Sequence, residues 1–220
     1  MPLAPRTRTA LIVAIPLLAL ACAAFVFTVP PDVFPDTGLP RLGTMVRFVM
    51  FHGASTWVNM LTFTLAGLFG LAYVISSKTA FGRWGEAFRW ISLPLWAVNT
   101  VLGILSMQLI WGGILWDEPR LLMTFGLLIA GVVILAVQLI FDHPKVPAVL
   151  DALLAVALWA MVLLLPNLFH PDSPVFSSGN WEYIGRFFGM VITLAGIAGC
   201  AATLIARRRH TDHPHWHAVP

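Results

Sequence analysis

The sequence predicts an all-α, polytopic integral membrane protein with six transmembrane helices, and three observations support this fold class. Of the 220 residues, 59% are hydrophobic and only 10% are charged, whereas soluble domains carry about 25% charged residues. Apolar runs of about 20 residues, the length that crosses a bilayer as a helix, recur along the chain. Short stretches with Pro, Gly and charged residues separate these runs. Strands of a β-barrel need only about 10 residues and alternate in polarity, so the runs indicate helices.

Each apolar run defines one predicted helix. The spans are residues 10–29, 43–76, 87–110, 121–141, 147–166 and 183–206. The second span is long for one crossing, and we expect it to tilt or to project beyond the bilayer. No repeat or long linker interrupts the series. The sequence therefore predicts one transmembrane domain over residues 1–220, which ends in a flexible, cytoplasmic, His-rich tail at 207–220.

The first span shares features with a secretory signal peptide, because Arg6 and Arg8 precede it and the segment from Ala19 to Ala21 resembles a cleavage site. The apolar run, however, continues through Val29, well past that segment. We therefore interpret the first span as a retained helix.

The basic residues predict the orientation, because cytoplasmic loops are enriched in Lys and Arg. Nine fall on the side of the termini and four on the other side. The first group is Arg6, Arg8, Lys78, Arg83, Arg89, Lys145, Arg207, Arg208 and Arg209, and the second is Arg41, Arg47, Arg120 and Arg186. Both termini are thus expected in the cytoplasm, in a multi-pass protein of the cell (cytoplasmic) membrane. The net charge of +3 reflects this topology and does not indicate nucleic-acid binding.

A stripe of polar residues enters the second span, where polar side chains are costly. It consists of His52, Ser55, Thr56, Asn59 and Thr62. Their spacing of three and four places them on one helix face. Two interpretations stay open: a row of interhelical hydrogen bonds, or a ligand site near the outer surface with His52 as a metal ligand.

The outward loop at 111–120 reads WGGILWDEPR. Trp111 and Trp116 suit a membrane interface whatever the function. The adjacent Gly112 would let a flat ligand approach the backbone, and aromatic faces can stack on such a ligand. Arg120, shortly after Asp117, can neutralise carboxylates. The segment therefore favours a planar, amphipathic ligand at the membrane surface.

A second outward histidine, His170, lies in the loop at 167–182. Together, His52 and His170 can supply both axial ligands of a haem iron. Arg47 and Arg186, near the outer ends of the second and sixth spans, are candidates to receive the propionates. Their ordinary alternative is snorkelling to the membrane interface.

With these residues the chain resembles the haem-handling proteins of cytochrome c assembly, the CcmC type and more distantly the CcsA type. The resemblance covers about residues 44–206. The WWD domain of that family reads roughly W-G-x-W-W-x-W-D followed by Arg, and Trp111-Gly112, Trp116-Asp117 and Arg120 match parts of it. Ile114 and Leu115 stand where the family has tryptophans. The segment RFVMFHGASTWVN resembles the family helix that opens with a haem-ligand histidine, here His52.

The resemblance implies a haem carrier rather than a catalyst, with a b-type, non-covalent haem presented on the extracytoplasmic side. The implied partners are a haem chaperone, ABC-type transporter subunits or an apocytochrome c, with membrane lipid around the chain and no nucleic acid. His170 comes earlier in its loop than the second histidine of the family. The second axial position therefore stays open between His170, a methionine such as Met190 and an empty site. The alternative function is a quinone-binding membrane-anchor subunit of a redox complex.

Other polar groups in the spans have structural interpretations. Asp151 follows Pro147 by one turn, which is ordinary chemistry for the start of a helix, and a proton relay is its alternative. Gln138 and Asn99 are interpreted as isolated packed groups. Cys22 and Cys200 form no CxxC pair and are expected to pack in the bundle.

Overall fold

The computed structural model describes residues 3–33, 38, 40–141, 143–165, 174–177 and 179–212. The long helices are α1 (Pro5–Phe27), α2 (Val46–Ser76), α3 (Thr79–Trp111), α4 (Pro119–Ile140), α5 (Lys145–Leu164) and α7 (Trp181–Asp212). A short helix α6 (Pro174–Ser177) precedes α7, and strands β1 (Asp32–Val33) and β2 (Pro40–Gly43) form an antiparallel ribbon before α2. Six of the described helices are long and apolar enough to cross a membrane. The predicted all-helical fold class with six long apolar helices is thus confirmed.

Three helices extend by at least five residues beyond their predicted spans. The first begins at Pro5 rather than at 10. The third begins at Thr79 rather than at 87, because Glu86 and Arg89 are buried in the bundle rather than exposed in a loop. The last continues to Asp212, six residues into the segment predicted as a tail. Residues 213–220 lie outside the described part. The ribbon and α6 were not predicted.

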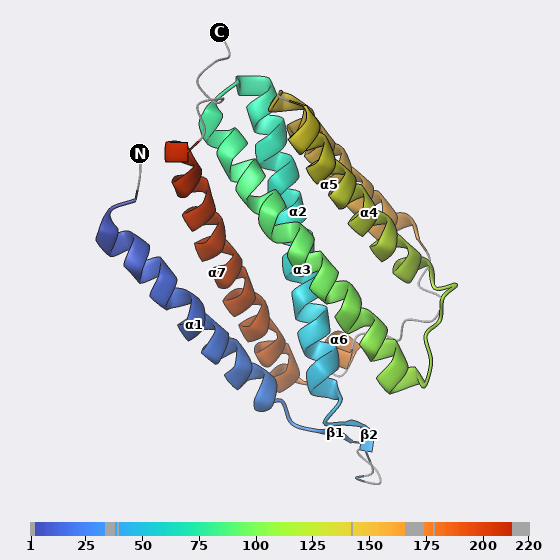
Figure 1. Cartoon of the computed structure of the whole chain (residues 1–220). Coiled ribbons are helices and arrows are strands. Elements are labelled where there is room, and N and C mark those ends of the chain that lie inside the picture. The colour runs from blue at the N-terminus through green and yellow to red at the C-terminus, as the bar shows by residue number, and fades with distance from the viewer. Residues whose placement is uncertain are drawn as a thin grey trace.

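The helices are arranged around α2, which packs against α3, α5 and α7. On one side α1 lies along α7, and on the other α4 lies beside α5 and α3 (Figure 1). The start of α1 and the end of α7 lie at one end of the bundle, here called the terminal end (Figure 1). The ribbon, the α3–α4 loop and α6 lie at the opposite end, the loop end. Large apolar side chains such as Leu139 remain exposed on the outside, as expected of a lipid-facing surface.

Glycines bring α2 unusually close to α5. A Cβ atom on Gly70 would lie 2.6 Å from the carbonyl oxygen of Ala148, and one on Gly67 would lie 2.6 Å from the Cβ of Ala155. Small residues at helix interfaces allow such backbone approach in membrane bundles. The same part of α2 also contacts α3, since a Cβ atom on Gly85 would lie 3.1 Å from the backbone N of Gly70.

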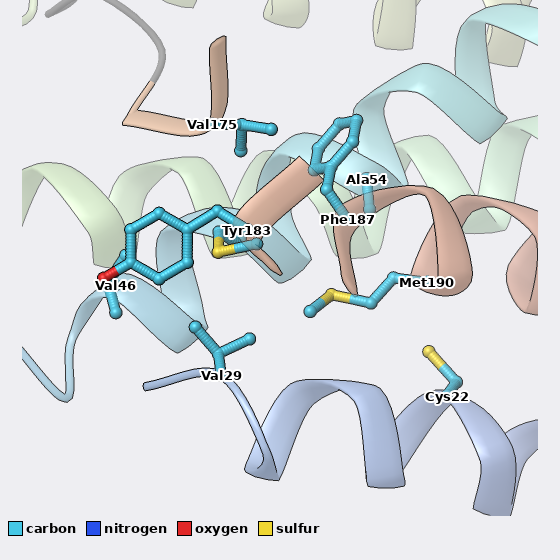
Figure 2. Packing of buried hydrophobic residues seen from close by; sticks show 9 residues of the cluster. Cys22, Val29, Val46, Ala54, Val175, Tyr183, Phe187 and Met190 are labelled. Atoms are coloured by element: carbon cyan, nitrogen blue, oxygen red, sulfur yellow. The ribbon is translucent and has the colours of Figure 1, made fainter. Parts of the chain in front are cut away.

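A hydrophobic core at the loop end joins α1, α2, α6 and α7. Figure 2 shows how its side chains interleave, with Met190 of α7 beside Cys22 of α1. The ribbon closes this core, since the Tyr183 hydroxyl lies 3.4 Å from the carbonyl oxygens of Pro30 and Pro31. Arg41 Nε donates to Asp32 at 2.8 Å, and this hydrogen bond raises the pKa of the Arg41 guanidinium above its ordinary value. The burial of Cys22 agrees with its predicted packing role.

Candidate functional site

The imidazole of His52 faces α3 and is half-buried. It lies six residues after the first residue of α2, about 9 Å below the start of the helix at the loop end. A Cβ atom on Gly103 of α3 would lie 3.3 Å from Cε1 and 3.6 Å from Nε2 of His52. Because Gly103 has no side chain, the imidazole fits against α3 in the seam between α2 and α3.

Below His52, the polar stripe of α2 is hydrogen-bonded to α3. Asn99 Nδ2 donates to the Thr56 hydroxyl at 3.0 Å, and the Ser55 hydroxyl donates to Asn99 Oδ1. Asn59 Nδ2 donates to the carbonyl of Leu95 at 3.3 Å. These contacts confirm interhelical hydrogen bonds for three residues of the stripe, Ser55, Thr56 and Asn59. They also show that the prediction of Asn99 as an isolated packed group was wrong.

The α3–α4 loop begins where α3 ends at Trp111. Gly112 has φ +73° and ends the helix in the left-handed conformation that favours glycine. Helix termination therefore accounts for this glycine without a ligand. Trp116 is 59% exposed and Asp117 is also exposed, whereas Trp111 and Arg120 are half-buried.

Helix α3 connects His52 to this loop. Gly103, which the imidazole touches, precedes Trp111 by eight residues, or about 12 Å along the helix. Trp96 Nε1 of α3 donates to the Thr124 carbonyl at 2.9 Å, and this bond holds the Arg120-bearing start of α4 on α3. A ligand that contacts both His52 and the loop must therefore extend about two turns along α3.

Arg47 and Arg186 lie at the loop end but are engaged with the end of α1. Arg47 Nε donates to the Val29 carbonyl at 2.9 Å. Arg186 donates to the Thr28 hydroxyl and to Glu182, both at 2.5 Å. These bonds tie the end of α1 to α2 and α7, and they engage only part of each guanidinium, which has five N–H donors.

His170 and Met190 are the candidates for a second axial ligand, and the structure describes only Met190. His170 lies outside the described residues. Four residues later, α6 is docked on α2, because Phe176 stacks on Trp57 with ring centroids 5.8 Å apart. Met190 is fully buried in the loop-end core beside Cys22 (Figure 2). Since Met190 packs toward α1 while His52 faces α3, the structure does not favour Met190 as the second ligand.

One acidic side chain of the loop was missed in the sequence. Glu118, the residue after Asp117, is fully buried at 0% exposure. It is the N-cap residue of α4, and its carbonyl accepts the backbone N–H groups of Leu121 and Leu122. The signal was its place directly before Pro119, because Pro favours the first position of a helix. The buried acid of this loop is thus Glu118, and Asp117 is the exposed one.

A buried polar cluster near the terminal end was also missed. Arg89 Nε donates to both carboxylate oxygens of Asp151 at 2.8 Å, and Arg89 Nη1 donates to Gln138 Oε1 at 2.6 Å. Gln138 Nε2 in turn donates to Glu86 Oε1 at 2.7 Å. The cluster joins α3, α4 and α5, so Gln138 is not isolated and Asp151 does not serve only to start a helix.

Because Arg89 belongs to this cluster, its charge is a buried one and not a loop charge. Arg89 is one of the nine basic residues on the side of the termini, but its side chain is only 8% exposed and pairs with Asp151. The available signal was the separation of Glu86 and Arg89 by three residues, which puts them on one helix face. The other eight basic residues of its group lie at the terminal end, and the four of the second group lie at the loop end.

Comparison with models of known protein families, with curated proteins and with solved structures found no match for this chain.

Proposed function

We propose that this chain is a membrane haem-binding and haem-transfer protein that presents haem at the loop end of the bundle. The observation that carries the proposal is the half-buried His52 imidazole in the α2–α3 seam, on the helix that leads to Trp111. A histidine nitrogen is an axial ligand of haem iron. The resemblance of the WGGILWDEPR segment to a WWD domain also supports haem as the bound molecule.

The described residues fit such a ligand in chemical type. His52 would bind the iron, and Trp111 and Trp116 offer aromatic faces for the ring. Arg120 offers a cation for the propionates. Bound haem would supply a metal centre whose axial exchange permits transfer to another protein.

The proposed orientation places the loop end outside the cytoplasmic membrane and both termini in the cytoplasm. The eight basic residues at the terminal end, against four at the loop end, support this orientation through the positive-inside rule. A haem chaperone, ABC-type transporter subunits or an apocytochrome c would then receive or supply haem at the loop end. These partners rest on the family resemblance.

The first test is a visible absorption spectrum of the protein purified in detergent after incubation with haem. We expect the wild type to show a Soret band at about one haem per chain and His52→Ala to lose most of it, because the imidazole is the proposed iron ligand. His143→Ala is the matched control. His143 is exposed near the terminal end, and this variant should keep the spectrum.

Two results would contradict the proposal: a wild type that binds no haem, or a His52→Ala variant whose spectrum is unchanged. A haem-free wild type that retains a quinone would instead support the quinone-binding membrane anchor.

A further inference from the structure

A lysine that forms no ion pair with a described residue joins the start of α5 to the end of α2. Lys145, the first residue of α5, is half-buried, and its Nζ atom donates to the Ser77 hydroxyl at 2.8 Å. None of the ion pairs between described residues includes it. Charges that leave water are ordinarily paired with an opposite charge. A half-buried ammonium group bonded to a neutral hydroxyl therefore favours an anion beside it.

The contact with Ser77 brings a second lysine to the same place. Ser77 ends α2 with φ +53°, and the next residue, Lys78, already caps the start of α3. Lys78 is exposed, and it too is absent from the ion pairs of the described residues. Ser77 and Lys145 are 68 positions apart in the chain, so the packing of α5 on α2 is what gathers the two lysines.

The described surface around the two lysines is cationic. Both belong to the eight basic residues at the terminal end. The two acidic side chains that the structure describes toward this end are Glu86 and Asp151, and they are 4% and 3% exposed within the Arg89 cluster. Buried acids do not neutralise the exposed charge, so this end attracts anions.

Exposed apolar side chains lie directly below the two lysines. On α2, Ile75 is 77% exposed and comes two residues before Ser77. On α5, Val149 is 42% exposed and follows Lys145 by one helical turn, on the same face of the helix. The close contact of Gly70 with Ala148 holds the two helices side by side at this depth. Cations at the helix ends above lipid-facing apolar side chains match the order of groups in a phospholipid.

We propose that Lys145 and Lys78 bind the phosphate of an anionic phospholipid, whose acyl chains lie along α2 and α5. An ammonium group and a phosphate form a charge-assisted hydrogen bond, stronger than one between neutral groups. In the proposed orientation this lipid belongs to the cytoplasmic leaflet, whose surface is negatively charged. The site is independent of haem, because it lies at the opposite end of the bundle from the α3–α4 loop.

Native mass spectrometry of the detergent-purified protein, titrated with phosphatidylglycerol or with phosphatidylcholine, tests the site. We expect the wild type to prefer phosphatidylglycerol. The double variant Lys78→Gln/Lys145→Gln should bind it about thirtyfold more weakly, the combined effect of two lysines near a lipid surface, and should bind phosphatidylcholine as the wild type does.

Arg6→Gln/Arg8→Gln is the matched control, because it removes two exposed charges from the same end of the bundle but from α1. This variant should keep the affinity for phosphatidylglycerol. Lys78→Arg/Lys145→Arg retains both charges and should also bind the lipid. An unchanged Tm of the glutamine variant in phosphatidylcholine checks that it is folded.

Three results would overturn the proposal. The first is a wild type that binds both lipids equally, and the second is an equal loss in the two glutamine variants, which would indicate the general charge of the terminal end. The third is displacement of the lipid by an equal concentration of inorganic phosphate, which would indicate an anion site that does not need acyl chains. A wild type that binds no haem would contradict only the proposed function.

Discussion

Among single residues, the Arg89–Asp151 pair has the clearest energetic role. Their side chains are 8% and 2% exposed, and Arg89 Nε lies 2.8 Å from both carboxylate oxygens. Removing one partner of such a pair leaves the other charge buried without compensation, which costs far more than the loss of a surface ion pair.

Asp151→Asn should therefore destabilise the protein strongly, by about 3–5 kcal/mol. The measurement is the thermal or denaturant midpoint of the detergent-solubilised protein. The control is Glu182→Gln, which alters an Arg–carboxylate pair whose carboxylate is 52% exposed and should change stability by about 1 kcal/mol or less. Equal effects of the two substitutions would show that the Asp151 pair does not hold α3 and α5 together.

The sequence predicted the position of some of these residues on their helices but not their partners. The stripe from His52 to Thr62 was predictable, because residues spaced by three and four lie on one face of a helix. The partner of each residue was not predictable, since Arg89 and Asp151 are 62 positions apart and their pairing depends on how α3 and α5 pack. The contact of Gly103 with the His52 imidazole was not predictable for the same reason, because it depends on how α2 and α3 pack.

For the helices as elements, glycines bring the backbone of α2 against that of α5. Helix bounds followed from hydropathy because lipid contact requires long apolar runs. The beginning of α3 did not, since its first turns are polar and stabilised by burial in the bundle. Hydropathy also gave no indication of which helices touch, whereas the glycines at 67 and 70 determine the α2–α5 contact.

Gly70→Ala should destabilise the protein by about 1–3 kcal/mol, as expected for overpacking. Its new Cβ would lie 2.6 Å from the Ala148 carbonyl oxygen, and backbone atoms cannot move aside as a flexible side chain can. Alanine is otherwise the better helix former by about 1 kcal/mol.

The matched control for that substitution is Gly126→Ala in α4, where a Cβ would meet nothing within 4 Å. This variant should be neutral or slightly stabilised in the same unfolding experiment. A stabilised Gly70→Ala variant would mean that the α2–α5 seam is looser than described.

For the whole molecule, the two ends of the bundle differ in charge and in chemistry. Most basic residues and the Arg89 cluster lie toward the terminal end, while His52, the α3–α4 loop and the ribbon lie toward the loop end. Six long helices bring the start of α1 and the end of α7 to the same end of the bundle (Figure 1). The proposed function requires the loop end to face away from the cytoplasm.

Cysteine labelling in intact cells tests this orientation. In a background with Cys22→Ala and Cys200→Ala, a membrane-impermeant maleimide should label Asp117→Cys at the loop end. Ala80→Cys, exposed in the first turn of α3, should react only after the membrane is permeabilised. The reverse pattern would contradict the positive-inside assignment and the extracytoplasmic haem site together.

The Arg89–Asp151 pair also has a consequence for biosynthesis. Since the two residues are 62 positions apart, the ribosome makes α3 well before α5, and the guanidinium enters the insertion machinery without its counter-charge. A lone arginine in lipid is disfavoured. We therefore expect nascent α3 to be retained in the translocon until α5 emerges, and chains truncated before Asp151 to be degraded faster than chains that end after it.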